Sequence, residues 1–127
     1  MKNFLSLAFS AVAAMLMLLS VNVSAAEQPM LKDGVLVNES GMTLYTFDKD
    51  KADSGKSVCN GQCATLWPPL VADKDAKASG EYSVITRDDG TKQWAYDGMP
   101  LYLYSADKKA GDRSGDNVKN VWHVIKK

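Results

Sequence analysis

The sequence predicts an all-β or predominantly β single small domain made of two pseudo-repeated β units with short loops or helical turns. Short apolar runs alternate with clusters of glycine, aspartate and asparagine, which is typical of strands joined by turns. Apolar residues at helical spacing are few, and one segment recurs later in the chain. The content of 46% hydrophobic and 24% charged residues fits a globular protein and excludes a disordered or collagen-like chain.

The first 26 residues are interpreted as a secretory signal peptide. Lys2 supplies a positive start, residues 4–21 are apolar apart from scattered serines, and residues 23–26 are small, as at a cleavage site. A transmembrane anchor is the alternative, since the apolar run approaches the length that crosses a bilayer. No cysteine follows the leader, so lipid anchoring has no basis in the sequence. We therefore expect a secreted domain at 27–127 in the periplasm or outside the cell, with no membrane span after processing.

The exported part has nearly balanced charge. The chain holds 15 basic and 15 acidic residues, and only Lys2 of these lies in the leader, so residues 27–127 have a formal net charge of −1. The longest basic runs are the pairs Lys108-Lys109 and Lys126-Lys127. Because attraction to nucleic acid needs clustered cations, we expect no nucleic-acid partner.

The first unit is expected at about residues 34–71. Val35–Val37 and Met42–Phe47 predict a hairpin around the Asn38-Glu39-Ser40-Gly41 turn. A short helical turn is possible at Gln62–Leu66. The following Trp67-Pro68-Pro69-Leu70 cannot be a central strand, because proline has no N–H for the ladder, and we expect an extended edge segment with Trp67 in the core.

The second unit is expected at about residues 82–126, after a polar surface connection at Asp73–Gly80 in which a helical turn is also possible. Val121–Ile125 predicts a final strand. Three runs separated by turn residues predict an antiparallel meander: Tyr82–Thr86, Thr91–Tyr96 and Met99–Tyr104.

Cys59 and Cys63 are the only cysteines of the chain. In an oxidising compartment, with Asn60-Gly61 able to adopt the positive φ of a tight turn, a local disulfide is the favoured state. So short a loop gives about 2 kcal/mol in the chain-entropy model. Redox or metal use stays as the alternative, but a metal or haem site needs further ligands and His123 is sixty residues away. We predict no metal and no cofactor.

An internal repeat relates the two units. Gly41–Asp50 matches Gly98–Asp107 at a constant offset of 57, with glycine, methionine, leucine, tyrosine and aspartate in common. A tryptophan follows in each unit, Trp67 and Trp122, at an offset of 55. Two units are too few for a solenoid, so we expect them to pack against each other in one domain.

At these residues the chain resembles the secreted bacterial repeat proteins with a Tyr-x4-Asp motif, Yx(FWY)xxD, which are often described as predicted lipoproteins. The motif stands here as Tyr45-Thr46-Phe47-Asp48-Lys49-Asp50 and as Tyr102-Leu103-Tyr104-Ser105-Ala106-Asp107. The segments from Cys59 to Leu70 and from Val121 to Val124 are also similar to the family pattern. The resemblance implies a secreted repeat domain, and because the family has no established activity it implies no catalytic residues. The chain lacks the anchoring cysteine of the lipoprotein members.

The motif has two interpretations. Tyr45 and Phe47 share one face of a strand while Leu44 points to the other, which suits a strand covered on both sides whose final aspartate accepts backbone N–H groups. The competing interpretation is an exposed aromatic platform for a sugar ring or hydrophobic peptide, bordered by carboxylates. The candidate motif or binding residues are Tyr45, Phe47, Asp50, Trp67, Tyr102, Tyr104, Asp107 and Trp122.

These patterns favour a non-enzymatic binding or envelope-associated protein, with an envelope component or small molecule as its unidentified ligand. The sequence contains no nucleophile elbow, phosphate loop or paired metal-binding histidines, and His123 is expected to be a partly buried, hydrogen-bonded histidine. One alternative is a small periplasmic redox or metal-handling protein that uses Cys59 and Cys63. Another is a hydrolase of envelope polymers, which only the aromatic and carboxylate groups favour.

Overall fold

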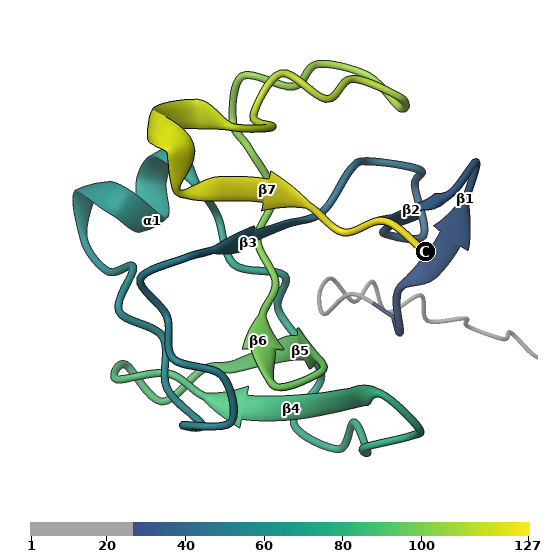
Figure 1. The fold of residues 1–127 in the computed structure, drawn as a ribbon. Helices are drawn as coiled ribbons and strands as arrows, with labels where there is room; N and C mark the ends of the chain where they lie inside the picture. Colours follow the sequence, from purple (N-terminus) through teal and green to yellow (C-terminus); the bar gives the residue numbers. More distant parts are fainter. Residues whose placement is uncertain (1–26) are drawn as a thin grey trace, which may run out of the picture.

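The computed structural model describes residues 27–127, and the predicted signal peptide at 1–26 lies outside them. Figure 1 shows short strands in small antiparallel sheets, with little helix, so the all-β prediction is confirmed. The elements are β1 (Met30–Lys32), β2 (Val35–Val37), β3 (Tyr45–Phe47), α1 (Gln62–Leu66), β4 (Tyr82–Thr86), β5 (Lys92–Tyr96), β6 (Met99–Pro100), the 3-10 helix η1 (Val118–Asn120) and β7 (Trp122–Val124).

The predicted meander forms as the sheet β4-β5-β6. Its first two strands pair antiparallel from Tyr82 opposite Tyr96 to Thr86 opposite Lys92. The third strand is much shorter than expected and ends at Pro100. The reason is that the chain leaves this sheet at once, and Tyr102 pairs instead with Tyr45 and Pro69.

The first unit differs more from its prediction. The turn after β2 does bring the chain back, since Val37 forms a bridge with Thr43 and the Leu44 N–H donates to the Leu36 carbonyl at 3.0 Å. However, β2 pairs along its length with β1, an exposed strand that the sequence analysis missed, and β3 pairs with β7 of the second unit. The expected hairpin therefore forms only next to its turn, up to Leu44, and the Tyr45–Phe47 part of the expected strand pairs with β7 instead.

The two units pair their strands with each other in a reciprocal arrangement. Tyr45 and Tyr102 donate their backbone N–H groups to each other's carbonyls, both at 2.9 Å. Beyond this pair, β3 of the first unit lies against β7, while Leu103 of the second unit donates to the carbonyl of Pro68 at 2.7 Å. The proline segment is thus extended, as expected. The core of the molecule is built jointly by both units.

Two apolar clusters flank the exchanged strands. One is largely aromatic, and the other is centred on the fully buried Leu36, Leu44 and Leu101. Both faces of the motif strands are therefore covered. Burying a leucine side chain of this kind contributes about 1.5–3 kcal/mol.

The two possible helical turns have different outcomes. Gln62–Leu66 is α1, as expected, and positions Trp67 by a hydrogen bond from the Trp67 N–H to the Cys63 carbonyl at 2.8 Å. Asp73–Gly80 contains no helix, because Asp73 accepts the Asp75 N–H on its side chain and forms a local turn instead. Within residues 27–127, no helix has the length and apolar character needed to cross a membrane.

Candidate functional site

Each tyrosine of the repeated motif bonds to the aspartate of the other repeat. The Tyr45 hydroxyl donates to Asp107 Oδ2 at 2.6 Å, and the Tyr102 hydroxyl donates to Asp50 Oδ2 at 2.5 Å. Tyr45 and Tyr102, the motif tyrosines, are fully buried, and Asp50 and Asp107, the motif aspartates, are 4% and 7% exposed. The repeats are therefore joined by two buried, reciprocal bonds.

The second oxygen of each motif aspartate closes a turn in its own unit. Asp50 Oδ1 accepts the Val58 N–H at 2.7 Å, and Asp107 Oδ1 accepts the Ser114 N–H at 2.9 Å. This is the backbone role that the sequence indicated for the aspartates. The bond to the opposite tyrosine is new, because a linear pattern does not reveal which copy supplies the partner.

Burial controls the ionisation of this group. Desolvation raises the pKa of each motif tyrosine well above its ordinary value of 10.0, and the adjacent carboxylate raises it further. Desolvation also raises the pKa of Asp50, although its bonds from Tyr102 and Val58 and the nearby Arg87 act in the opposite direction. At neutral pH the motif tyrosines are firmly protonated and serve as hydrogen-bond donors.

A buried arginine, which the sequence analysis missed, extends the network. Arg87 is only 5% exposed, and it donates to Ser57 Oγ at 2.9 Å and to Gln93 Oε1 at 2.7 Å. The Ser57 Oγ lies 2.6 Å from the Tyr102 hydroxyl, so Arg87, Ser57, Tyr102 and Asp50 form one chain of donors and acceptors. The only signal in the sequence is that Arg87 directly follows an apolar strand, which does not separate a buried arginine from a solvated one.

The remaining motif aromatics form a stack of four rings. Phe47 stacks on Trp122 at 4.1 Å between ring centroids, Trp122 on Trp67 at 3.8 Å, and Trp67 on Tyr104 at 4.0 Å. The two tryptophans are parallel within 2° and come one from each unit. Since Trp67 and Trp122 are about 95% buried or more, their faces contact other rings and only edges reach the surface.

An open groove of about 500 Å³ runs along this stack. In Figure 1, α1 lies beside η1, which is the unlabelled yellow helical turn that precedes β7, and residues of both line the groove. The first unit contributes Phe47, Lys49, Gln62, Cys63, Leu66 and Trp67. The second unit contributes Tyr104, Val118, Lys119, Val121 and Trp122.

The predicted disulfide is present between Cys59 and Cys63, with the Cα atoms 5.2 Å apart. Cys59 is fully buried, and its carbonyl accepts an Arg87 N–H at 2.6 Å. Cys63 is partly buried and lies at the groove wall. The bridge therefore fixes the start of α1 against the motif network.

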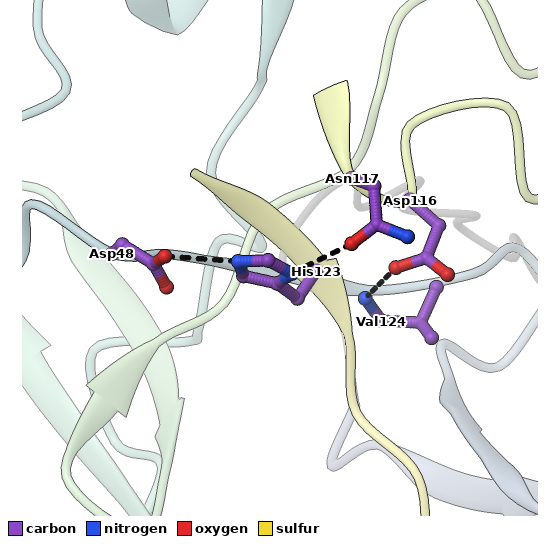
Figure 2. Close-up of polar contacts among 5 residues, drawn as sticks. All are labelled: Asp48, Asp116, Asn117, His123 and Val124. Atoms are coloured by element: carbon purple, nitrogen blue, oxygen red, sulfur yellow. Dashed lines mark hydrogen bonds and ion pairs between the residues drawn. The ribbon is translucent and has the colours of Figure 1, made fainter. Parts of the chain in front are cut away.

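His123 lies on β7 and is partly exposed, and Figure 2 shows its ring between Asp48 and Asn117. Its Nε2 is 2.9 Å from Asp48 Oδ2, and its Nδ1 is 3.2 Å from Asn117 Oδ1. The neighbouring Asp116 accepts the Val124 N–H at 3.1 Å, also drawn in Figure 2. These contacts hold the loop before η1 against the end of β3, and they agree with a hydrogen-bonded, partly buried histidine.

Metal ligands do not gather in the described part of the chain. No group of three or more histidine, cysteine, aspartate or glutamate side chains in residues 27–127 is arranged to hold an ion. The motif aspartates are engaged by hydroxyl and backbone donors, and His123 contacts one carboxylate.

Comparison with known proteins now defines the class. The family model Lipoprotein_15, described as a secreted repeat of unknown function, matches residues 31–71 and again residues 83–126. The chain belongs to this family of secreted repeat proteins. No curated protein and no solved structure gives a significant match. The disulfide agrees with an oxidising compartment outside the cytosol.

Proposed function

We propose that this protein is a non-enzymatic binding protein of the periplasm or the cell exterior, and that its ligand occupies the groove along the aromatic stack. The observation that carries the proposal is the groove itself. Its volume of about 500 Å³ lies within the range of small-molecule sites, and its lining is mostly apolar and aromatic with a few polar side chains.

The titratable groups support binding over catalysis. A general acid or base works best with a pKa near the operating pH, and burial shifts the motif tyrosines further from neutrality. Asp50 is shifted toward neutrality, but it is buried and bonded to Tyr102 and Val58. His123 has a carboxylate and an amide as its contacts and no nucleophile.

The stack also favours a ligand that enters a groove over a sugar that covers an aromatic platform. Stacking on a sugar needs an open ring face, and the faces of Trp67 and Trp122 are used within the stack. The ring edges, with Leu66 and Val121 beside them, form an apolar floor instead.

A thermal-shift screen of small molecules against the exported protein tests this function. Leu66 is 50% exposed and lines the groove, so Leu66→Gln should remove ligand binding with little effect on folding. Val58 is 56% exposed and lies outside the groove lining, so Val58→Gln is the matched control and should bind as wild type does. A ligand that stabilises both variants equally would place the site elsewhere, and the proposal would fail.

Export has its own test. The small residues at 23–26 favour cleavage that leaves a chain beginning at Ala26 or Glu27. The intact mass of protein recovered from the periplasm and from the medium, measured separately, gives both the cleavage site and the destination. A retained leader or an added acyl chain would contradict a soluble exported protein.

A further inference from the structure

Equivalent positions of the two units supply the apolar part of the groove. The offset of 55 that relates Trp67 to Trp122 also relates Leu66 to Val121 and Cys63 to Val118, and all six residues line the groove. Each unit thus supplies equivalent apolar groups to one continuous floor. A floor of this kind, shared by two units, accommodates one apolar ligand segment along its length.

The two units differ in charge at two positions of the groove. Lys49 of the first unit corresponds to Ala106, and Lys119 of the second unit corresponds to Ala64. Both lysines line the groove, and none of its lining residues is acidic. Each unit therefore adds one cation to the groove at a position where the other unit has a small apolar residue.

Neither lysine is neutralised by a neighbour among residues 27–127. The ion pairs there are His123 with Asp48 and Lys127 with Glu81. Asp48 precedes Lys49 in the chain, but its carboxylate is engaged by His123. The two cations at the groove are left for a ligand.

Lys119 is also held in an uncommon backbone conformation. Its φ of 51° lies in the left-handed region, which asparagine tolerates better than lysine. The neighbours Asn117 and Asn120 adopt the same region, with φ of 68° and 64°. A lysine kept where asparagine fits better is the kind of local strain that accompanies functional sites.

We infer that the ligand is a single-chain anionic amphiphile, with an apolar tail on the aromatic floor and a carboxylate head between Lys49 and Lys119. This inference rests on the proposed binding function and adds the class of ligand. The apolar floor suits a tail, and two exposed lysines without an ion-pair partner among residues 27–127 suit a negative head. A monomer is favoured over a membrane surface, because a flat bilayer does not enter a concave groove.

Calorimetry with matched probes tests the inference on the exported protein. The probes are dodecanoate, dodecanol and dodecyltrimethylammonium, which share one tail and differ in head charge, together with acetate, which has the head alone. Two exposed ion pairs should make dodecanoate bind about tenfold more tightly than dodecanol. The preference should shrink as salt is added, since exposed charges are screened. Acetate should not bind measurably.

A double variant tests whether the two lysines cause the preference for dodecanoate over dodecanol. Lys49→Gln with Lys119→Asn removes both charges, and asparagine preserves tolerance of the left-handed backbone. Dodecanoate should then bind no more tightly than dodecanol, while dodecanol binding is unchanged. Lys74→Gln, which removes an exposed lysine outside the groove lining, should retain the wild-type preference.

The outcomes of these experiments distinguish the proposed binding function from the inferred class of ligand. If none of the three tailed probes binds, the amphiphile class is wrong, and the thermal-shift screen decides separately whether the groove binds another small molecule. If all three bind equally, or if the double variant keeps its preference for dodecanoate, the groove binds apolar molecules but the anionic class is wrong. Binding to anionic vesicles without binding to monomeric dodecanoate would replace the monomer with a membrane surface and overturn the inference.

Discussion

The hydrogen bonds between the tyrosine of one repeat and the aspartate of the other predict how strongly mutations at these residues affect each other's free energy of unfolding. Tyr102→Phe keeps the ring in the core and removes one hydroxyl, so Asp50 Oδ2 and the Ser57 hydroxyl each lose a buried partner. Loss of a hydrogen bond to a charged group costs about 1.5–3 kcal/mol. Asp50→Ala leaves the Val58 N–H without an acceptor and the Tyr102 hydroxyl with Ser57 as its remaining partner, and we expect a loss of about 1–3 kcal/mol.

Double-mutant cycles measured by urea unfolding distinguish the partners. Tyr102→Phe and Asp50→Ala should couple by about 1–2 kcal/mol, and so should Tyr45→Phe and Asp107→Ala. Tyr45 and Asp50 belong to the same motif copy, but no hydrogen bond joins their side chains and neither perturbs the pKa of the other. Their coupling should therefore stay within about 0.5 kcal/mol.

Asp73→Ala is the control for aspartate removal in general. Asp73 is exposed and its side chain accepts only the Asp75 N–H, so its loss should stay within about 0.5 kcal/mol. If the larger coupling falls between residues of the same copy, the exchange between repeats is incorrect. If Asp50→Ala and Asp107→Ala match wild-type stability, the buried network contributes nothing and the motif requires another explanation.

Three further outcomes follow from the geometry. Burial raises the folded-state pKa of both motif tyrosines above 10.0, so their contribution to the stability of the fold is complete below pH 10 and is lost as the pH rises toward the folded-state pKa. In that pH range the free energy of unfolding should fall by up to about 2.7 kcal/mol per pH unit for the two tyrosines together. Alkaline unfolding followed by tyrosinate absorbance measures this fall. Reducing the Cys59–Cys63 disulfide should cost about 2 kcal/mol without unfolding the domain, and denaturation with and without reductant compares the two states. Gly98→Ala should destabilise more than Gly34→Ala in urea unfolding: both glycines have φ near +80°, but a Cβ at Gly98 would lie 2.1 Å from an Asp53 oxygen and one at Gly34 would meet nothing within 4 Å. Equal losses for the two alanine variants would contradict the close approach at Gly98.

The sequence predicted elements whose signal is local. The meander from Tyr82 to Tyr96, the disulfide and the burial of Trp67 each depend on turn residues, export or proline chemistry within a few positions. Pairing between β3 and β7 joins residues more than seventy positions apart, and no periodicity in either strand specifies that partner. The repeat indicated that the two units pack together. However, a repeated sequence is equally compatible with two units that pack side by side and with two units whose strands pair with each other.

The candidate site was predictable in composition and unpredictable in arrangement. All eight motif residues were selected from the sequence, yet the same list contains two groups with different environments. The four tyrosine and aspartate side chains form hydrogen bonds across the repeats and do not line the groove, whereas Phe47, Tyr104, Trp67 and Trp122 stack on one another and line it. Lys49 and Lys119 were not selected, because an isolated lysine has no distinctive pattern until the fold places it beside an apolar floor.

Exchange of the tyrosine–aspartate bonds explains why the motif needs a second copy. In a lone unit, Tyr45 would have no acceptor for its buried hydroxyl, and Asp50 would keep the Val58 N–H but lose the Tyr102 hydroxyl. An unpaired buried polar group costs about 1–3 kcal/mol, which is a large share of the stability of a small domain. The stack has the same requirement, since Trp67 and Trp122 each cover the other's face. The groove between α1 and η1 exists only where both units are present, so the dependence of folding on a second copy and the formation of the site have one structural cause.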